Sequence, residues 1–160
     1  MIRYAEGVGF AKAPITTPHG PQMREDIRNN TRVMVDEPQR AAWLFARLRE
    51  HLPAELRGWR LTDLNERLRW YRYEPGERFE WHRDGWYRRS REERSRLTLM
   101  IYLSADFDGG ETHVEIGGQQ LSVVPEAGMA VWFPHQLMHT GAVVSRGRKY
   151  VLRTDVMYTR

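Results

Sequence analysis

The sequence predicts a mainly β fold with flanking helices (α+β), a sandwich or barrel of the jelly-roll type. From Leu68 to Tyr158 the chain shows seven or eight short segments of strand character, which turn residues separate. The helical periodicity is confined to the residues before them. The length of 160 residues suits a single domain with one hydrophobic core.

The N-terminal part is expected to hold irregular chain and one supporting helix. Three prolines and a glycine fall between positions 14 and 21, so we expect the first thirty-odd residues to be irregular. A helix is predicted from about Asp36 to Leu52, with Asp36 as its cap, Pro38 in its first turn and Pro53 ending it. Its apolar residues recur every three or four positions on one face: Ala41, Leu44, Phe45, Leu48 and Leu52. We expect this helix to pack on a sheet and assign it no chemistry.

The remaining chain predicts strands and tight turns in alternation. The segment 97–103, LTLMIYL, is apolar almost throughout and indicates a strand that is buried on both faces. Turns are expected at 74–76, 108–110 and 117–118, where proline or glycine residues gather. The other predicted strands are 68–73, 112–116, 120–124, 129–133 and 149–158.

The composition excludes several classes of site. Hydrophobic residues make up 41% and aromatic residues 11%, which is typical of a globular protein. The absence of cysteine excludes disulfides, thiolate zinc sites, iron–sulfur clusters and a cysteine nucleophile. It is compatible with the reducing cytoplasm, where we expect the protein. No apolar run approaches the roughly 18 residues of a membrane helix, and the N-terminus lacks the apolar core of a signal peptide.

The charge does not identify a partner. The net charge is +4, and six of the 25 basic residues lie between Arg83 and Arg96. Asp84, Glu92 and Glu93 interrupt this stretch, so a solvated loop is favoured over a nucleic-acid patch.

A His-x-Asp pair is the first candidate for chemistry. If residues 80–84 are extended, His82 and Asp84 point to the same side and can bind one ion. A third ligand must then come from another of the six histidines, and His139 lies beyond the strand that ends at Phe133. Two histidines and one carboxylate leave open positions on a metal, as in non-haem Fe(II) oxygenases. The alternative is a His82–Asp84 ion pair with His139 as a core histidine.

The flanking residues resemble a known family. Tyr73-Glu-Pro-Gly-Glu-Arg-Phe-Glu-Trp-His-Arg-Asp84 is similar to the Y-x-P-G-x-x-F/Y-x-x-H-x-D segment of prolyl 4-hydroxylase-like Fe(II)/2-oxoglutarate-dependent dioxygenases. Residues 97–104 resemble the family's LT-x-x-I-Y-L-N strand and residues 107–112 its F-x-G-G-x-T turn. Four further family positions and the G-x-K/R start of the last strand correspond to Pro125, Gly128, Phe133, His139 and Gly147–Lys149. The resemblance covers about 68–158 and does not extend to the N-terminal third.

The resemblance implies a fold and a set of ligands. It implies a double-stranded β-helix (a cupin-like jelly roll), with residues 1–66 as N-terminal loop and supporting helix and 67–160 as the core of one domain. His82, Asp84 and His139 would bind Fe(II), and these three are the expected catalytic residues. His113 and His135 would then have surface or structural roles.

The resemblance also implies a site for the co-substrate. A cation about nine to ten residues past His139 would bind the C5 carboxylate of 2-oxoglutarate, and Lys149 is chosen over Arg148 for its strand parity. Arg153 is the rival, because a charge within a strand is costly unless it is paired, and an ion pair with Asp155 is its other interpretation. Tyr102 and Tyr73 would reach the co-substrate, although Tyr73 also suits an ordinary core position.

The activity implied is the hydroxylation of a C–H bond, coupled to O₂ use and to release of succinate and CO₂. We expect a prolyl or other protein residue, or a small amino-acid-like molecule, as the prime substrate. Nucleic-acid demethylation ranks behind, because Arg148 and Arg153 do not form an R-x-x-x-x-x-R pattern. A non-catalytic jelly roll and a cupin-type metal hydrolase or isomerase remain alternatives. Candidate substrate contacts are Trp86, Arg88 and Thr112, with a solvated loop as the other interpretation of the residues after Asp84.

Overall fold

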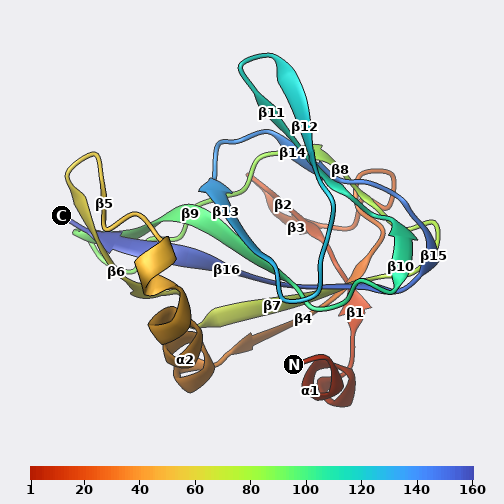
Figure 1. The fold of residues 1–160 in the computed structure, drawn as a ribbon, viewed down its shortest axis with the longest axis horizontal. Coiled ribbons are helices and arrows are strands. Elements are labelled where there is room, and N and C mark those ends of the chain that lie inside the picture. Colours follow the sequence, from red (N-terminus) through yellow and green to blue (C-terminus); the bar gives the residue numbers. More distant parts are fainter.

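Two antiparallel β-sheets form the body of the protein, one above the other in the view of Figure 1. The structure is a computed structural model that describes residues 1–160. The larger sheet contains β1 (Ala11–Lys12), β4 (Thr31–Asp36), β5 (Glu55–Leu56), β6 (Trp59–Leu64), β7 (Arg67–Tyr73), β9 (Glu93–Tyr102), β13 (Ala130–Pro134) and β16 (Lys149–Thr159). The smaller sheet has the order β12 (Gln119–Val123), β11 (Thr112–Ile116), β14 (His139–Gly141) and β8 (Phe79–His82).

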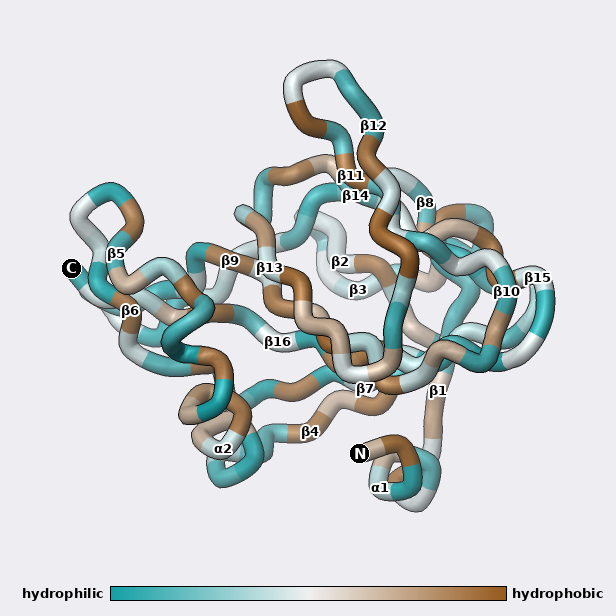
Figure 2. Tube along the Cα trace, viewed as in Figure 1, coloured by the Kyte–Doolittle hydropathy of each residue, from teal (hydrophilic) through white to brown (hydrophobic).

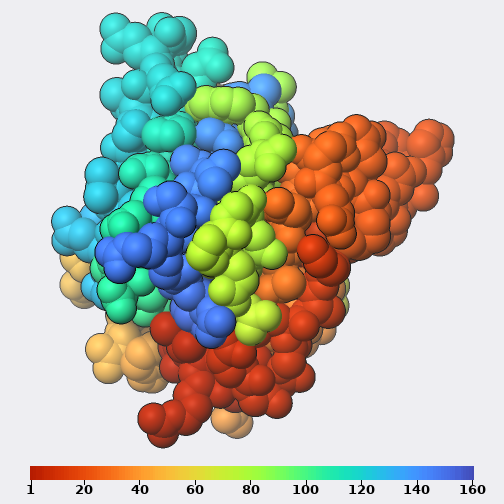
Figure 3. Space-filling model, turned by 90° about the vertical axis from the view of Figure 1, so that its right-hand side faces the viewer, coloured from red at the N-terminus to blue at the C-terminus, as the bar shows by residue number.

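Two short antiparallel strand pairs and three helical segments complete the fold. They are β2 (Ile15–Thr17) with β3 (Gly20–Gln22), β10 (Phe107–Gly109) with β15 (Val144–Gly147), the helices α1 (Ile2–Val8) and α2 (Pro38–Leu48), and the 3₁₀ turn η1 (Arg49–His51). In Figure 3 the β2–β3 region projects from the body of the protein as an orange lobe, and the β11–β12 hairpin projects separately from the body in teal. No helix is both long and apolar enough to cross a membrane.

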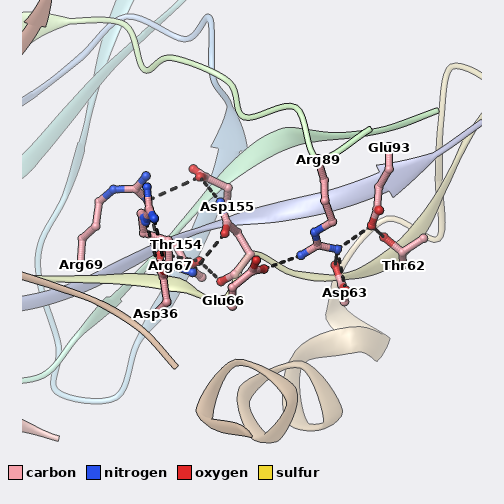
Figure 4. Close-up of polar contacts among 11 residues, drawn as sticks. Asp36, Thr62, Asp63, Glu66, Arg67, Arg69, Arg89, Glu93, Thr154 and Asp155 are labelled. Carbon is pink, nitrogen blue, oxygen red and sulfur yellow. Dashed lines mark hydrogen bonds and ion pairs between the residues drawn. The ribbon is translucent and has the colours of Figure 1, made fainter. Parts of the chain in front are cut away.

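The predicted β architecture is confirmed, and so is the predicted supporting helix, as α2 and η1, but the prediction of an irregular start to the chain is wrong. The first thirty residues are not irregular, because they form α1 and three short strands. The predicted helix begins at Pro38, with Glu37 rather than Asp36 at its cap. Asp36 instead ends β4 and accepts two hydrogen bonds from Arg67, 2.8 and 2.9 Å long (Figure 4). Short strands such as β14 and β15 were also missed, because three or four residues carry too little pattern.

The strands of the larger sheet separate an apolar face from a polar one. Along β7, Leu68 and Trp70 are fully buried on the side where α2 packs, through Ala41 and Leu44. Each such side chain stabilises the fold by roughly 1.5–3 kcal/mol. Figure 2 shows hydrophobic and hydrophilic residues alternating along these strands. Side chains along a strand point to opposite faces in turn, so the residues that alternate with Leu68 and Trp70 face the smaller sheet.

The inward face is unusually polar for a sheet interior. Strand pairing places Arg69 beside Arg153, and Arg153 beside Met100. One row further, Arg32 pairs with Tyr71. This face forms one wall of a pocket with a volume of about 690 Å³, and the smaller sheet forms another.

The arginine-rich segment 83–96 is a solvated loop only in part: residues 85–88 and 90–92 are exposed, as predicted, whereas Arg89 and the residues from Glu93 onward are held against the body. Arg89 contacts three carboxylates, those of Asp63 at 2.9 Å, Glu66 at 2.6 Å and Glu93 at 2.6 Å (Figure 4). Arg94 belongs to β9 and stacks over the Trp59 ring at 4.3 Å. These contacts attach the residues that follow Asp84 to the body of the protein.

Candidate active site

The three predicted metal ligands converge at the edge of the smaller sheet. His82 ends β8 and is the register partner of His139, the first residue of β14. Their ring centroids lie 4.2 Å apart, and the carboxylate of Asp84 joins them, so that one ligand atom from each residue lies within 4.8 Å of the others. His82 and His139 therefore come from neighbouring strands of one sheet, β8 and β14.

Backbone carbonyls orient both imidazole rings. The carbonyl oxygen of Glu80 lies 2.7 Å from Nδ1 of His82, and that of Leu137 lies 2.9 Å from Nδ1 of His139. With a proton on each Nδ1, these nitrogens donate to the carbonyls and leave Nε2 free as a ligand atom. The Nε2 atoms lie 3.9 Å (His82) and 3.6 Å (His139) from the Asp84 carboxylate. This arrangement of two imidazole nitrogens and one carboxylate oxygen fits a divalent transition metal.

The protonation states also suit a metal. Burial, followed by the neighbouring His139, lowers the pKa of His82 to about 4, so its ring is neutral near pH 7. Burial by itself would raise the pKa of Asp84, but the charge of Arg153, with His139 and the Thr98 hydrogen bond, holds it well below its usual value. A neutral imidazole beside a carboxylate argues against the alternative of a His82–Asp84 ion pair.

A buried hydrogen-bond chain supports Asp84, and sequence reasoning did not assign it to the site. Thr98 Oγ1 donates to Asp84 Oδ2 at 2.6 Å and lies 2.9 Å from Nδ1 of His135. Nε2 of His135 lies 2.8 Å from the Ser95 hydroxyl, and the His135 carbonyl accepts the Asp84 backbone N–H at 2.9 Å. His135 thus has a structural role, as predicted, and through Thr98 it supports Asp84, one of the candidate metal ligands. The polar Thr98 within an apolar strand was the available signal.

Lys149 lies on the inward face of β16 with its ammonium group in the same pocket. The side chain is 2% exposed, and no carboxylate lies within ion-pair distance of Nζ. Nζ donates to the carbonyl of Gly110 at 2.6 Å and lies over the rings of Tyr73 (5.1 Å) and Tyr102 (5.6 Å). Burial lowers the pKa of Lys149 to about 8, against the opposing charge of Glu111. A buried cation without a carboxylate partner is costly unless a ligand supplies the anion.

The predicted Gly109–Gly110 turn makes this position possible. Both glycines have positive φ, and a side chain on Gly109 would meet the Val143 carbonyl at 2.4 Å. A Cβ on Gly110 would lie 3.2 Å from Cδ of Lys149. The turn is therefore packed directly against the lysine, which is a physical reason for two consecutive glycines.

The two rival cations are engaged elsewhere. Arg148 points away from the pocket, where Nε contacts Glu74 at 2.8 Å with half of its side chain exposed. Arg153 lies in the pocket but contacts both Asp84 (3.2 Å) and Asp155 (3.1 Å), as the ion-pair interpretation expected. The structure thus favours Lys149 as the cation for a dicarboxylate.

The remaining candidates divide between the pocket and the surface. Trp86 lines the pocket and is half exposed, whereas Arg88 lies outside the lining, with its guanidinium 5.3 Å from the Trp86 ring. Thr112 is buried beside Lys149 and accepts a 2.7 Å hydrogen bond from Tyr102. It therefore belongs to the wall around the lysine rather than to the open part of the pocket. His113 is on the surface, as predicted, with Nδ1 2.8 Å from the Ser122 hydroxyl.

Comparison with known proteins agrees with this geometry. A family model described as the 2OG-Fe(II) oxygenase superfamily matches residues 68–154, which hold all three candidate ligands and Lys149. A PKHD-type hydroxylase of Sphingopyxis alaskensis is 33% identical over 89 residues, which are 53% of this chain and 41% of that protein. The matched region thus spans about two fifths of the length of that curated relative.

Solved structures share the fold at low sequence identity. A prolyl-4-hydroxylase of Pseudomonas putida aligns with a TM-score of 0.68 and 22% identity, over 99% of this chain and 81% of that chain. A prolyl hydroxylase of Trichoplax adhaerens, in complex with a hypoxia inducible factor oxygen degradation domain peptide fragment, aligns with a TM-score of 0.71 and 13% identity. That alignment covers 94% of this chain and 72% of the other. These likenesses establish the double-stranded β-helix as the fold.

Proposed function

Because this chain belongs to the 2OG-Fe(II) oxygenase superfamily, we propose that it hydroxylates a C–H bond of an amino-acid-type substrate. In the overall reaction, substrate, O₂ and 2-oxoglutarate give hydroxylated substrate, succinate and CO₂. The observation that carries the proposal is that one pocket contains both a set of metal ligands and an unpaired cation that can bind an anion. The His82–Asp84–His139 cluster lies on one wall, and the unpaired cation of Lys149 lies on another.

His82, Asp84 and His139 would hold Fe(II), which when bound supplies the oxidising chemistry by activating O₂. Three protein ligands leave positions for a bidentate 2-oxo acid and for O₂. The carbonyls of Glu80 and Leu137 hold the imidazoles in one tautomer, and Thr98 holds one oxygen of Asp84. The chain thus contributes an ordered ligand set before any metal arrives.

Lys149 would bind the C5 carboxylate of 2-oxoglutarate. The lysine lies between Tyr73 and Tyr102, so its charge is shielded from water by aromatic rings. An ion pair in such a low-dielectric setting is much stronger than one at the surface. An incoming carboxylate would supply the ion-pair partner that Lys149 does not have among the side chains of this protein.

The experiment that tests this function uses the metal and the co-substrate. Anaerobic addition of Fe(II) and 2-oxoglutarate to the purified protein is expected to give a weak visible charge-transfer band. Admission of O₂ is then expected to give succinate. The His139→Ala variant should show neither, because one nitrogen ligand is missing. The proposal fails if the wild-type protein gives neither signal and His139→Ala binds iron as well as wild type.

The substrate class has its own support. The pocket of about 690 Å³ falls in the range of small-molecule sites, and 2-oxoglutarate would occupy part of it. The Trichoplax adhaerens neighbour holds a peptide fragment, so a protein residue is the second candidate. Screening succinate release against amino acids, peptides and oligonucleotides distinguishes these candidates, and release with oligonucleotides alone would contradict both.

We also propose that residues 1–66 and 67–160 make up one domain. Strand β4 pairs with β7 across this boundary over six residue pairs, and α2 packs on β6 and β7. Limited proteolysis should therefore release no stable core that lacks residues 1–66.

A further inference from the structure

The pocket carries more positive charge than the metal and co-substrate require. Six cationic side chains line it against two carboxylates, those of Asp84 and Asp155. Fe(II) and the 2-oxoglutarate dianion have cancelling formal charges, so their binding leaves this surplus unchanged. The cations are Arg28, Arg32, Arg69, Arg83, Lys149 and Arg153.

Three of these arginines have no carboxylate partner, and two of the three, Arg28 and Arg32, are buried or partly buried. Arg69 and Arg153 both contact Asp155, at 3.4 and 3.1 Å, and Arg83 donates to the Gln136 carbonyl from an exposed position. Arg28 and Arg32, in contrast, make no ion pair. They are therefore the cations available to a second ligand.

Arg28 is the more constrained of the two. Its side chain is almost fully buried, at 4% exposure, and its guanidinium lies 4.4 Å from the centroids of both Tyr71 and Phe79. Nε donates to Oδ1 of Asn30 at 2.7 Å, but the buried Nη2 has no hydrogen-bond partner. Leaving a buried donor of a charged group without a hydrogen-bond partner is unfavourable. Such a group is typical of a site that a ligand completes.

Arg32 extends the same positive region. It lies on the inward face of β4 and pairs in register with Tyr71. Burial would raise the pKa of Tyr71, but the charges of Arg28, Arg153 and Arg69 lower it below its usual value. Since the charges of Arg28, Arg153 and Arg69 together outweigh the effect of burial on this pKa, the Tyr71 hydroxyl lies in a positively charged part of the pocket.

This region lies close to the metal ligands and one inward-facing row along the sheet from Lys149, because Tyr71 pairs with Val151 and Tyr73 with Lys149. Phe79, which stacks on Arg28, also stacks on the His82 ring at a centroid distance of 3.5 Å. Pro14, Ile15 and Thr16, from the β2–β3 lobe of Figure 3, line the pocket as well. A molecule bound by Arg28 would therefore lie close to the metal site, because only the Phe79 ring separates Arg28 from the imidazole of His82.

We propose that Arg28 and Arg32 bind a carboxylate of the prime substrate, and that the substrate is a free amino acid held by its α-carboxylate. This rests on the proposed function and names its substrate class. A guanidinium between two rings offers its in-plane edge, which suits the planar carboxylate. The backbone of a nucleic acid is too bulky to bring its phosphates to a side chain as buried as Arg28.

Matched ligands test the carboxylate directly. Each of the twenty L-amino acids and its carboxamide is titrated anaerobically into wild-type protein loaded with Fe(II) and 2-oxoglutarate, with the fluorescence of the pocket residues Trp81 and Trp86 as the signal. At least one acid is expected to bind about tenfold or more tightly than its amide, as one lost charged hydrogen bond implies. The same acid should stimulate succinate release.

Variants locate the binding site. Arg28→Gln and Arg32→Gln should each abolish the preference for the acid over the amide. The Arg32 side chain is only partly buried, so the Arg32→Gln variant keeps the test valid if Arg28→Gln does not fold. Arg60→Gln, an exposed arginine of β6 outside the pocket, is the matched control and should keep the preference. The charge-transfer band with 2-oxoglutarate should be unchanged in all three variants.

Several results would overturn the inference. Equal binding of acids and amides would do so, as would binding confined to peptides or oligonucleotides, or an acid preference that survives in both variants. A parallel loss of 2-oxoglutarate binding would assign these arginines to the co-substrate instead. The failure of the proposed function is a separate result, because it would appear as the absence of the charge-transfer band and of succinate in wild type.

Discussion

His82 and His139 are direct register partners on two antiparallel strands, and their ring centroids lie 4.2 Å apart. The pairing of β8 with β14 therefore brings the two imidazoles together without any contribution from a loop. Sites built on paired strands hold their side chains more accurately than sites on loops. The metal cluster is accordingly a property of the smaller sheet, to which Asp84 adds the carboxylate.

The first prediction concerns these ligands. His82→Ala and Asp84→Asn should each lower the affinity for Fe(II), or for Co(II) as a spectroscopic substitute, by more than about 100-fold. Calorimetric titration measures the loss. His113→Ala is the control, since this histidine lies on the surface beside Ser122. Equal losses in the control would mean that histidines outside the cluster bind the metal.

The second prediction separates the three candidate cations for 2-oxoglutarate. Lys149→Met should weaken 2-oxoglutarate binding about 10- to 100-fold, because a charge-assisted hydrogen bond contributes roughly 1.5–3 kcal/mol. Arg148→Met should leave the affinity unchanged, because Arg148 contacts Glu74 outside the pocket. The charge-transfer band measures both. A larger loss in Arg153→Met with intact metal binding would assign the role to Arg153.

The third prediction is a pH dependence. Burial lowers the pKa of Lys149 to about 8, so the ammonium group is present below pH 8 and is lost above it. A dicarboxylate prefers the charged form; its affinity should be constant up to about pH 8 and then decrease, by at most tenfold per pH unit. Calorimetric titration of Mn(II)-loaded protein with 2-oxoglutarate measures this. Lys149→Arg stays charged and should show no decrease; the same decrease in that variant would point to another group.

The fourth prediction tests the chain that supports Asp84. Thr98→Val removes the 2.6 Å donor to Asp84 and should reduce metal affinity about 10- to 100-fold. Thr98→Ser keeps the hydroxyl and should restore most of the affinity. A merely structural role would lower the melting temperature of both variants without this difference in metal affinity.

The fifth prediction concerns the attachment of the segment after Asp84. Arg89→Gln leaves three neighbouring carboxylates without their shared cation (Figure 4). The free energy of unfolding should fall by about 1–3 kcal/mol, which thermal denaturation detects as a drop of several degrees. Arg146→Gln breaks an exposed pair with Asp108 and should not change the melting temperature. An unchanged Arg89→Gln protein would show that this network adds nothing to stability.

Much of the core was predictable because it depends on short-range pattern. The jelly-roll fold, the superfamily and its association with Fe(II) and 2-oxoglutarate are confirmed. Strand periodicity placed Leu68–Tyr73, Thr112–Ile116 and Lys149–Tyr158 within a residue or two of the observed strands. In the N-terminal third the supporting helix was predictable from its apolar periodicity, whereas α1 and the strands β1 to β3 were not, because such short elements carry little pattern of their own.

The sequence by itself determined which residues of one strand or one short segment share a side, because that depends only on their spacing. His82 and Asp84 are two residues apart, and Lys149, Arg153 and Asp155 share one strand parity, because the side-chain period of a strand is two. Only the tertiary structure decided what depends on pairing between distant segments. Four contacts of the site arise in this way: the pairing of His139 with His82, the ion pair of Arg153 with Asp84, the hydrogen bond between His135 and Thr98, and the stacking of Arg28 on Tyr71. The physical reason is that strand register and burial, which set the neighbours of each charge, are global properties of the fold.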